Sequence, residues 1–423
     1  MWKKPWGYKE GFICGAGLLV TGLLLQSITG GIRWELFAWS INIIVLALYL
    51  FLLTAMHLLR KRVYAFEWLS HYTSAVSSLI YVAAITVLMG CIRQVPSTQS
   101  PVDLLGLSKM LSFWPFVLLY SWLASALGLT ILRTSFPLKV RKIPFLLNHM
   151  GLFIVLLTTT FGSADLQRLR MITQIGKTEW RATDENGKLV ELPLAIELKD
   201  FTIYEYPPKL MLIDNRTGQP LPANAPEHLL LEDGITSGKL LDWEVTILQS
   251  IPMAASVATE DTLKYTEFHS MGATYAIYLT ATNTNTGQTK RGWVSNGSFA
   301  FPYKALHLNG ENSLVMPERE PQRFVSDVTV YTQEGSILQD TIEVNHPLKV
   351  AGWNIYQLSY DETKGRWSNI SIFELVRDPW LPFVYTGIIM MVLGEICLFI
   401  NAPKEKEVSS DEKQTEYKEE GNI

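Results

Sequence analysis

Cysteine is scarce in this chain of 423 residues and is confined to its apolar parts. The three that occur, Cys14, Cys91 and Cys397, lie in or beside long hydrophobic segments. The long polar stretch from about residue 163 to about residue 380 contains none. No disulfide framework can therefore hold that stretch together, and its stability must come from packing.

Several short motifs that carry chemistry are also missing. The sequence contains no Cys-x-x-Cys-His and no Cys-x-x-Cys, which excludes a c-type cytochrome and argues against thiol reduction. It lacks the P-loop and the dinucleotide-binding glycine fingerprint, so nothing indicates work driven by a nucleotide. The net charge of −4, without a basic aromatic patch, argues against nucleic acid as a partner.

Long hydrophobic runs are abundant, and 48% of the residues are hydrophobic. Each run is long enough to cross a hydrocarbon layer of ~30 Å as a helix, the form that satisfies its own backbone in lipid. The runs lie near 12–29, 37–59, 73–92, 113–132, 143–162 and 381–400. A signal peptide is the competing interpretation of the first run, but no small-residue cleavage site supports it.

Lysine and arginine are distributed unequally among the short connections between these runs. Ten of them lie in the N-terminal tail, the 60–62 loop and the 133–142 loop. The alternate loops carry only Arg33, Arg93 and Lys109. The cation-rich side is expected to be cytoplasmic. Both termini are then cytoplasmic, and residues ~163–380 form a large domain on the other side of the membrane.

The large polar stretch has the alternation of β-strands. Period-two patterns occur at Leu189–Phe201, Trp243–Leu248, Thr274–Ala281, Val328–Tyr331, Asn354–Tyr360 and Ile370–Val376. Turn signals separate them at Asn186-Gly187, Thr217-Gly218, Thr286-Gly287 and Glu334-Gly335. We predict a mainly antiparallel β-sandwich or paired β-sheets. The stretches Leu221–His228 and Leu314–Arg323 are predicted to be loops, and the Glu- and Lys-rich tail Lys404–Ile423 to be disordered.

One histidine differs from the other six in its surroundings. His149 lies seven residues beyond Lys142, which places it ~10 Å inside the fifth apolar run at ~1.5 Å per residue. Ionisable groups within a span often face the bundle interior and carry function, and imidazole is a good axial ligand for haem iron. The alternative is a histidine that hydrogen-bonds across helices or reaches the interface. His57 and His71 lie at the cytoplasmic interface, where a wet polar tip is the simpler interpretation.

Several uncommon residues occur in order where the polar domain meets the last apolar run. They are the Asn345-His346-Pro347-Leu348 turn, the Gly352–Tyr360 strand and the Asp378–Gly387 segment. Together they resemble the ResB family of cytochrome c maturation proteins. Asn148–Phe153 and Phe161–Asp165 are similar to the family's span that leads into the exterior domain. The similarity extends roughly from Phe66 to Ile400, with Pro379-Trp380 where the family usually has Pro-Gly.

The resemblance implies a fold and a division of the chain. We expect a membrane protein with a six-helix transmembrane bundle, five spans N-terminal and one C-terminal, and a large mainly-β extracytoplasmic domain. The expected parts are two extra helices in 1–62, core helices in 63–165, the β-rich domain in 166–380, the last helix in 381–400 and a cytoplasmic tail in 401–423. The two extra helices lie outside the family's minimal core.

The resemblance also implies a function. The chain would be a subunit of the cytochrome c synthetase complex in the inner membrane, non-catalytic or co-catalytic, that helps to export haem and to position it with apocytochrome c. Haem b would be bound transiently, with His149 as one axial ligand of its iron and His71 as the reserve candidate. The other ligand would come from a tryptophan-rich membrane subunit of the CcsA or ResC type, whose haem-handling motif this chain lacks. Membrane lipid completes the expected partners.

Two alternatives remain open. The chain could be a structural scaffold that stabilises the haem-handling subunit and does not itself bind haem. It could also be an unrelated small-molecule transporter with an accessory domain, although no broken helices or charge pairs within the spans support that interpretation.

Overall fold

The computed structural model describes residues 2–96, 99–232, 234–258 and 263–400. The tail for which disorder is predicted lies outside the described residues. The chain divides into two compact units. A helical unit contains the residues up to Leu166 and those from Asp378 on, and a β unit contains Gln167–Arg377. The predicted fold class, a six-helix membrane protein with a large β-rich domain, is confirmed.

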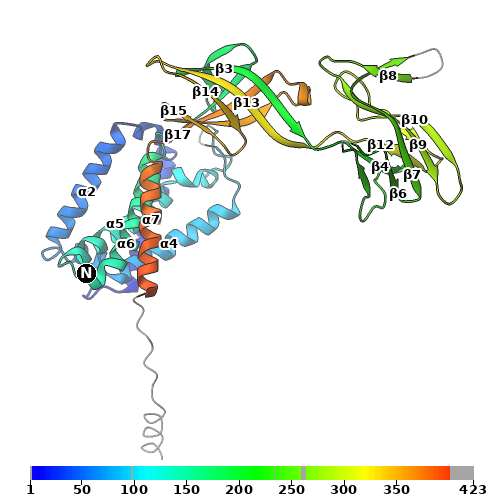
Figure 1. The fold of residues 1–423 in the computed structure, drawn as a ribbon. Coiled ribbons are helices and arrows are strands. Elements are labelled where there is room, and N and C mark those ends of the chain that lie inside the picture. Colours follow the sequence, from blue (N-terminus) through cyan, green and yellow to red (C-terminus); the bar gives the residue numbers. More distant parts are fainter. Residues whose placement is uncertain (1, 97–98, 233, 259–262, 401–423) are drawn as a thin grey trace, which may run out of the picture. The chain divides into compact units, whose positions relative to one another are not determined.

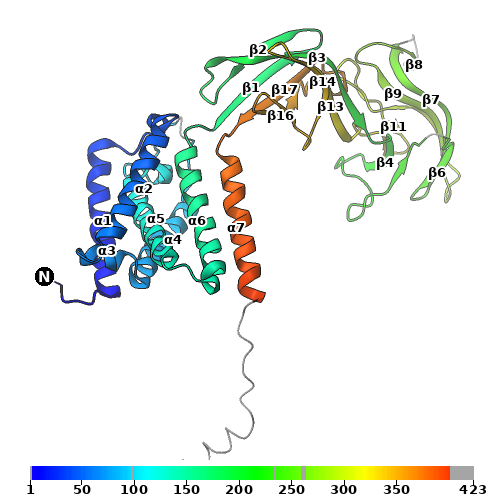
Figure 2. The same ribbon diagram turned by 60° about the vertical axis from the view of Figure 1, so that its left-hand side comes forward.

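Six helices of the first unit are long and apolar enough to cross a membrane, which makes the chain a multi-pass membrane protein (Figure 1). They are α1 (Tyr8–Thr29), α2 (Ile41–Leu59), α4 (Tyr72–Cys91), α5 (Trp114–Ser135), α6 (Ile143–Gly162) and α7 (Leu381–Ile400). A short helix, α3 (Tyr64–Leu69), joins α2 to α4. Of the six, α5 is the most buried, because it packs against α1, α2, α4 and α6 (Figure 2).

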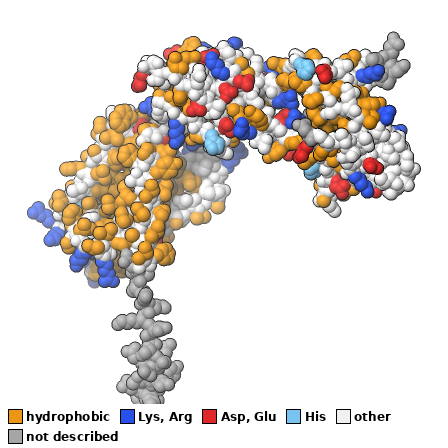
Figure 3. Space-filling model, in the orientation of Figure 1, with side chains coloured by type: hydrophobic (Ala, Val, Ile, Leu, Met, Phe, Trp, Pro, Cys, Tyr) orange, Lys and Arg blue, Asp and Glu red, His pale blue; other side chains and the backbone are white. Residues whose placement is uncertain are grey.

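The outer surface of the helical unit is apolar, as expected for contact with lipid (Figure 3). Large side chains such as Ile44, Phe51, Val87 and Ile389 are more than half exposed. The lysine and arginine side chains of this unit gather near one of its ends in the same view. An apolar exterior with charge restricted to the ends is the pattern of a bundle surrounded by hydrocarbon.

The second span is shorter than the sequence predicts. The apolar run starts near residue 37, but α2 begins only at Ile41. Residues Trp34–Phe37 instead form a separate 3₁₀ turn. Leu36 and Trp39 are largely exposed there, as interfacial side chains are. Hydropathy measures which residues prefer lipid but not where the backbone turns, and this explains the difference.

The contact between α6 and α7 depends on glycine. The two backbones approach so closely at Gly151 and Gly387 that a Cβ on Gly387 would lie 2.7 Å from the Gly151 carbonyl oxygen. One heptad further along α7, a Cβ on Gly394 would lie 2.7 Å from the Asn148 nitrogen. Apolar side chains gain little from packing in lipid, so small residues that let backbones meet hold membrane helices together.

A second contact of this kind holds α1. Its Gly11, Gly15 and Gly22 are buried, and they pack against Ser77 and Tyr81 of α4 and against the start of α5. Tyr81 also donates a hydrogen bond of 2.8 Å from its hydroxyl to the Phe12 carbonyl. The first apolar run is therefore packed as a member of the bundle.

The β unit begins and ends in an eight-stranded sheet. Its strands, in spatial order, are β14 (Ile337–Glu343), β13 (Pro321–Thr332), β3 (Leu189–Glu205), β2 (Thr178–Thr183), β1 (Gln167–Gln174), β17 (Ile370–Arg377), β16 (Trp353–Tyr360) and β15 (Leu348–Val350). Alternate residues of β3, namely Leu192, Leu194, Ile196 and Leu198, are buried. These side chains pack with β13, β16 and β17 into one apolar core. The period of two in the sequence is the cause of this sheet.

Two further antiparallel sheets form the rest of the β unit. One contains β10 (Thr289–Ser295), β9 (Thr274–Asn283), β7 (Trp243–Ala258), β6 (Ser237–Leu240) and β8 (Leu263–Glu267). The other contains β11 (Leu306–His307), β12 (Asn312–Val315), β4 (Lys209–Asp214) and β5 (His228–Leu230). A second apolar core, with Trp243, Ile277, Leu279 and Leu212 among its members, joins these two sheets.

The strand and turn predictions are confirmed, whereas the loop predictions are partly wrong. All six predicted strands lie within strands, and the glycines of all four turns have a positive φ. Only part of Leu314–Arg323 is a loop, because Leu314 and Val315 continue β12 and Pro321 already begins β13. In the other loop, His228 begins β5. Pro321 is the first residue of β13, a position where its missing N–H weakens the sheet little, and the other prolines of these stretches lie between strands.

The α6–α7 contact predicts that adding a single methyl group there destabilises the helical unit. We expect Gly387→Ala to lower the free energy of unfolding by about 1–3 kcal/mol, because the carbonyl of Gly151 cannot move away without separating the helices. The measurement is thermal unfolding in detergent, with labelling of the cysteine thiols as the signal for unfolding. Gly17→Ala is the matched control, since a Cβ on Gly17 has no neighbour within 4 Å. Equal melting of the two variants would contradict the close contact.

Candidate functional site

His149 lies in the first half of α6. Its ring is half-buried and stacks on Phe145, with 3.7 Å between the ring centroids. Its Nδ1 donates a hydrogen bond of 2.9 Å to the Phe145 carbonyl oxygen. In the neutral ring this bond leaves the proton on Nδ1 and a lone pair on Nε2. Among the described residues Nε2 has no partner, so this nitrogen is chemically able to act as a metal ligand.

The spacing along α6 separates two faces of the helix. Phe153, Leu156 and Thr160 contact α5, through Gly128 and the Tyr120 hydroxyl. His149 shares this stripe, because residues four, seven and eleven apart lie on one side of a helix. Asn148 belongs instead to the face that meets α7.

A second polar group lies beside His149 in sequence. The Asn148 side-chain amide donates a hydrogen bond to the Glu395 carboxylate on α7. The glycine at position 394 makes this possible, since it lets the two backbones meet next to Asn148. This side-chain hydrogen bond joins α6 to α7. No cluster of three or more His, Cys, Asp or Glu side chains able to hold a metal occurs among the described residues.

His71, the reserve candidate, is the residue before α4. Its backbone carbonyl accepts hydrogen bonds from the N–H groups of Ser74 and Ala75, and it is half-buried. In the described part of the chain no hydrogen bond or ring contact joins it to His149. The structure does not bring the two histidines together into one site.

Asp165 ties together three helix ends at the opposite end of α6 from His149. Its carboxylate accepts hydrogen bonds from the Trp39 backbone N–H at 2.6 Å, the Asn42 amide at 2.7 Å and the Trp380 indole at 2.7 Å. Asn42 is fully buried and also bonds the Phe161 carbonyl at 3.0 Å. This one carboxylate therefore connects the start of α2, the end of α6 and the start of α7.

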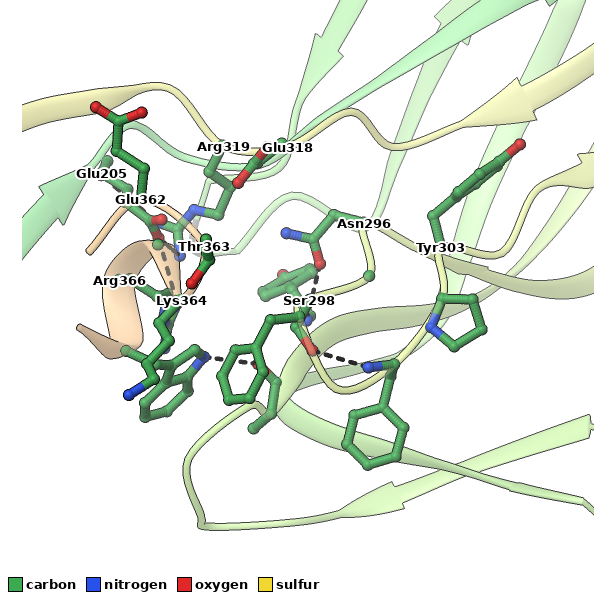
Figure 4. Close-up of a pocket in the computed structure, with 18 residues that line it drawn as sticks. Glu205, Asn296, Ser298, Tyr303, Glu318, Arg319, Glu362, Thr363, Lys364 and Arg366 are labelled. Carbon is green, nitrogen blue, oxygen red and sulfur yellow. Dashed lines mark hydrogen bonds and ion pairs between the residues drawn. The ribbon is translucent and has the colours of Figure 1, made fainter. Parts of the chain in front are cut away.

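A cavity of about 470 Å³ opens within the β unit (Figure 4). The chain passes between the eight-stranded sheet and the other two sheets at residues 206–208 and 316–320, and the cavity lies at these crossings. One wall carries Glu205, Arg319 and the turn Glu362–Trp367. The loop Asn296–Tyr303 forms the other wall. The Trp367 indole donates to the Ala273 carbonyl at 3.3 Å and links the two walls.

Two arginines share one carboxylate on the charged wall. Glu205 accepts from Arg319 at 3.2 Å and from Arg366 at 3.3 Å. Arg319 also donates from Nε to the Tyr206 carbonyl at 2.9 Å. Burial lowers the pKa of the Arg319 guanidinium, and the charge of Glu205 opposes that shift. On this wall two guanidinium groups thus share a single carboxylate, that of Glu205.

The segment that builds most of this cavity also matches a known family. Residues 273–369 match the sequence profile of the ResB-like family. The chain resembles ResB-like proteins. The resemblance inferred from the sequence is confirmed, and it suggests a role related to cytochrome c biogenesis. A comparison with the curated proteins gives no match to this chain.

The ResB-like segment covers some of the features described above and not others. It contains the loop Asn296–Tyr303, Arg319 and Arg366, so Glu205 is the one lining residue of the cavity outside it. The span of His149 and the last helix also lie outside it. The match thus supports the family of the β unit and leaves the role of His149 as a prediction.

Sequence reasoning missed the groups that the fold brings together from distant positions. Asn42 had a signal, since it is a polar residue in an otherwise apolar run, and Gly387 and Gly394 had one in their heptad spacing. Asp165 lies in a motif that carried the resemblance, but its three donors come from residues 39, 42 and 380. Arg319 and Arg366 stand in loops without periodicity, and nothing in the sequence pairs them with Glu205.

The cluster around Asp165 predicts a graded loss of stability. Asp165→Ala removes the acceptor of two buried side chains, Asn42 and Trp380, and a buried donor left unsatisfied costs about 1–3 kcal/mol. Trp380→Phe removes a single donor and should cost less. Thermal melting of the purified chain would measure the order. A smaller effect for Asp165→Ala than for Trp380→Phe would show that the carboxylate does not hold the helix ends.

Proposed function

We propose that this chain is the ResB-like subunit of a cytochrome c synthetase complex. It would help to move haem across the membrane and to position haem and apocytochrome c for covalent attachment. The observation that carries this proposal is the ResB-like match in a β unit inserted between the fifth and sixth helices of a membrane bundle. The six-helix architecture agrees with a role at the membrane.

Haem is the cargo in this proposal, and His149 is the residue that would bind it. The hydrogen bond from Nδ1 to Phe145 fixes the ring and leaves Nε2 as the potential ligand of haem iron. One imidazole supplies one axial position, so the second ligand is expected from the tryptophan-rich partner subunit. Bond formation between haem vinyl groups and cysteine thiols is chemistry of haem and apocytochrome, and this chain would contribute orientation.

The membrane orientation belongs to the same proposal. The cation-rich loops would face the cytoplasm, with both termini on that side. The β unit would then lie outside the inner membrane, where apocytochrome is matured. His149 would be in the cytoplasmic half of the bilayer, on the side from which haem arrives.

A structural scaffold is the second candidate, and one observation favours it. The His149 ring already has a hydrogen bond and a stacking partner, as a histidine that only packs would have. In that case the β unit would stabilise the haem-handling subunit without binding haem in this chain.

Haem content of the purified complex separates the two candidates. We expect His149→Ala to remove most of the co-purifying haem, because the side chain that ligates iron is gone, and added imidazole to restore part of it. His71→Ala is the matched control and should retain the haem. Absorption spectra of equal amounts of complex are the measurement. Unchanged haem content in the His149 variant would contradict haem binding and support the scaffold. Loss of haem in the His71 variant alone would identify His71, at the interface, as the ligand.

A further inference from the structure

We propose that the cavity at the crossings of the β unit binds a carboxylate that is carried on an aromatic or apolar body. This inference does not depend on haem binding by His149. It goes beyond the proposed function because it gives the β unit a binding site of its own, together with the chemistry of the ligand.

The charge of the wall that carries Glu205, Arg319 and Arg366 is the first argument. Glu205 holds both Arg319 and Arg366, so two guanidinium groups face one carboxylate. The side chains of Glu205, Arg319 and Arg366 are 12%, 19% and 32% exposed, so water compensates the extra charge only in part. A half-buried positive charge in excess is stabilised by an anion, and the guanidinium fork suits a carboxylate in particular.

The unused hydrogen-bond donors are the second argument. Arg366 lies over the Trp367 ring and donates a hydrogen bond through Nη1 to Glu205, so its Nε and Nη2 groups have no hydrogen-bond acceptor among the described residues. The Asn296 oxygen accepts from Thr274 and Tyr275, and among the described residues its Nδ2 group makes no bond. Figure 4 shows these side chains on opposite walls of the same space. Donors without acceptors on both walls fit a ligand whose polar atoms are acceptors.

The aromatic wall is the third argument. Phe299 is half exposed and Tyr303 is 68% exposed, although both line the cavity. Together with Phe301 and Pro302 they form an apolar rim opposite the arginines. Exposed aromatic groups beside a cavity of 470 Å³ suit a ligand that buries an apolar body while its acid reaches the two arginines.

Two further carboxylates line the cavity and would repel a bound anion. Glu318 and Glu362 line the cavity and are exposed, so solvent screens their repulsion of an anion. Lys364 lies 3.7 Å from Asp361, which neutralises part of its charge. The excess positive charge is thus greatest at the two half-buried arginines, and Arg366 is the one with donors that have no acceptor.

Two pairs of probes test the proposal, each differing by one carboxylate. The first pair is N-acetylphenylalanine and its neutral amide. The second is a tripeptide blocked at both ends, Phe-Glu-Phe, and its Phe-Gln-Phe counterpart. Binding to the full chain in non-ionic detergent is measured by titration calorimetry. We expect the acid of at least one pair to bind about tenfold or more tightly than its amide, since a charged hydrogen bond contributes about 1.5–3 kcal/mol.

Two arginine variants make the test specific. Arg366→Gln should abolish the preference for the acid. Arg181→Gln is the matched control and should keep the preference. Like Arg366, Arg181 pairs with a glutamate, at 2.9 Å, and stacks on the neighbouring tryptophan, but it does not line the cavity. Glu318→Gln changes only an exposed side chain and should tighten binding of the acid by about twofold. This opposite effect keeps the test decisive if the Arg366 variant does not fold.

The outcomes separate the source of the carboxylate. A preference for the acid in the tripeptide pair alone indicates an acidic side chain of a polypeptide. A preference in the N-acetylphenylalanine pair indicates a small organic acid. No preference in either pair, or a preference that survives Arg366→Gln, overturns the proposal. His149→Ala should leave the titrations unchanged, so failure here and failure of the haem proposal are distinguishable.

Discussion

The backbone contact between α6 and α7 is the constraint on which the rest of the molecule depends. The whole β unit is inserted between these two helices, and its first and last strands pair along their full length, with Gln167 opposite Arg377. The two chain crossings must therefore be neighbours. In the helical unit the glycines at 151, 387 and 394 allow this approach, and Asp165 bonds the start of α7 where α6 ends. Small residues and one carboxylate thus hold the two helices together, a role that disulfides have in many other proteins.

The same close approach gives α6 two faces with different tasks. Asn148 meets Glu395 across the α7 contact, whereas His149, one residue further, lies about 100° around the helix on the α5 stripe. Rotation of α6 is thus fixed by glycine packing and by an amide–carboxylate bond. A ligand histidine needs such fixed orientation, because the ring must present one nitrogen and keep its proton on the other. Packing and proposed function are therefore linked through one helix.

The β unit meets a different requirement, since it is large and contains no cysteine. Two large apolar cores and a smaller cluster around Tyr265 stabilise its sheets. The crossings between the two large cores are held by ion pairs and backbone bonds around Glu205, Arg319 and Arg366. A junction between cores is where charged groups can be half-buried without entering either core. That is also where the cavity lies, within the ResB-like segment apart from Glu205. The features that join the sheets and those that suit a ligand are thus the same residues.

The sequence by itself determined the six spans and the strands, because lipid and a half-buried sheet each impose a simple period on apolar residues. It also determined the four glycine turns, since a positive φ favours glycine so strongly. It indicated the family and singled out His149 as an ionisable group in an apolar run. Only the tertiary structure decided that Asp165 meets Asn42 and Trp380, that Asn148 meets Glu395, and that two arginines share Glu205. These contacts join residues up to 247 positions apart, and no local pattern records which distant side chains the packing of helices and sheets will bring together.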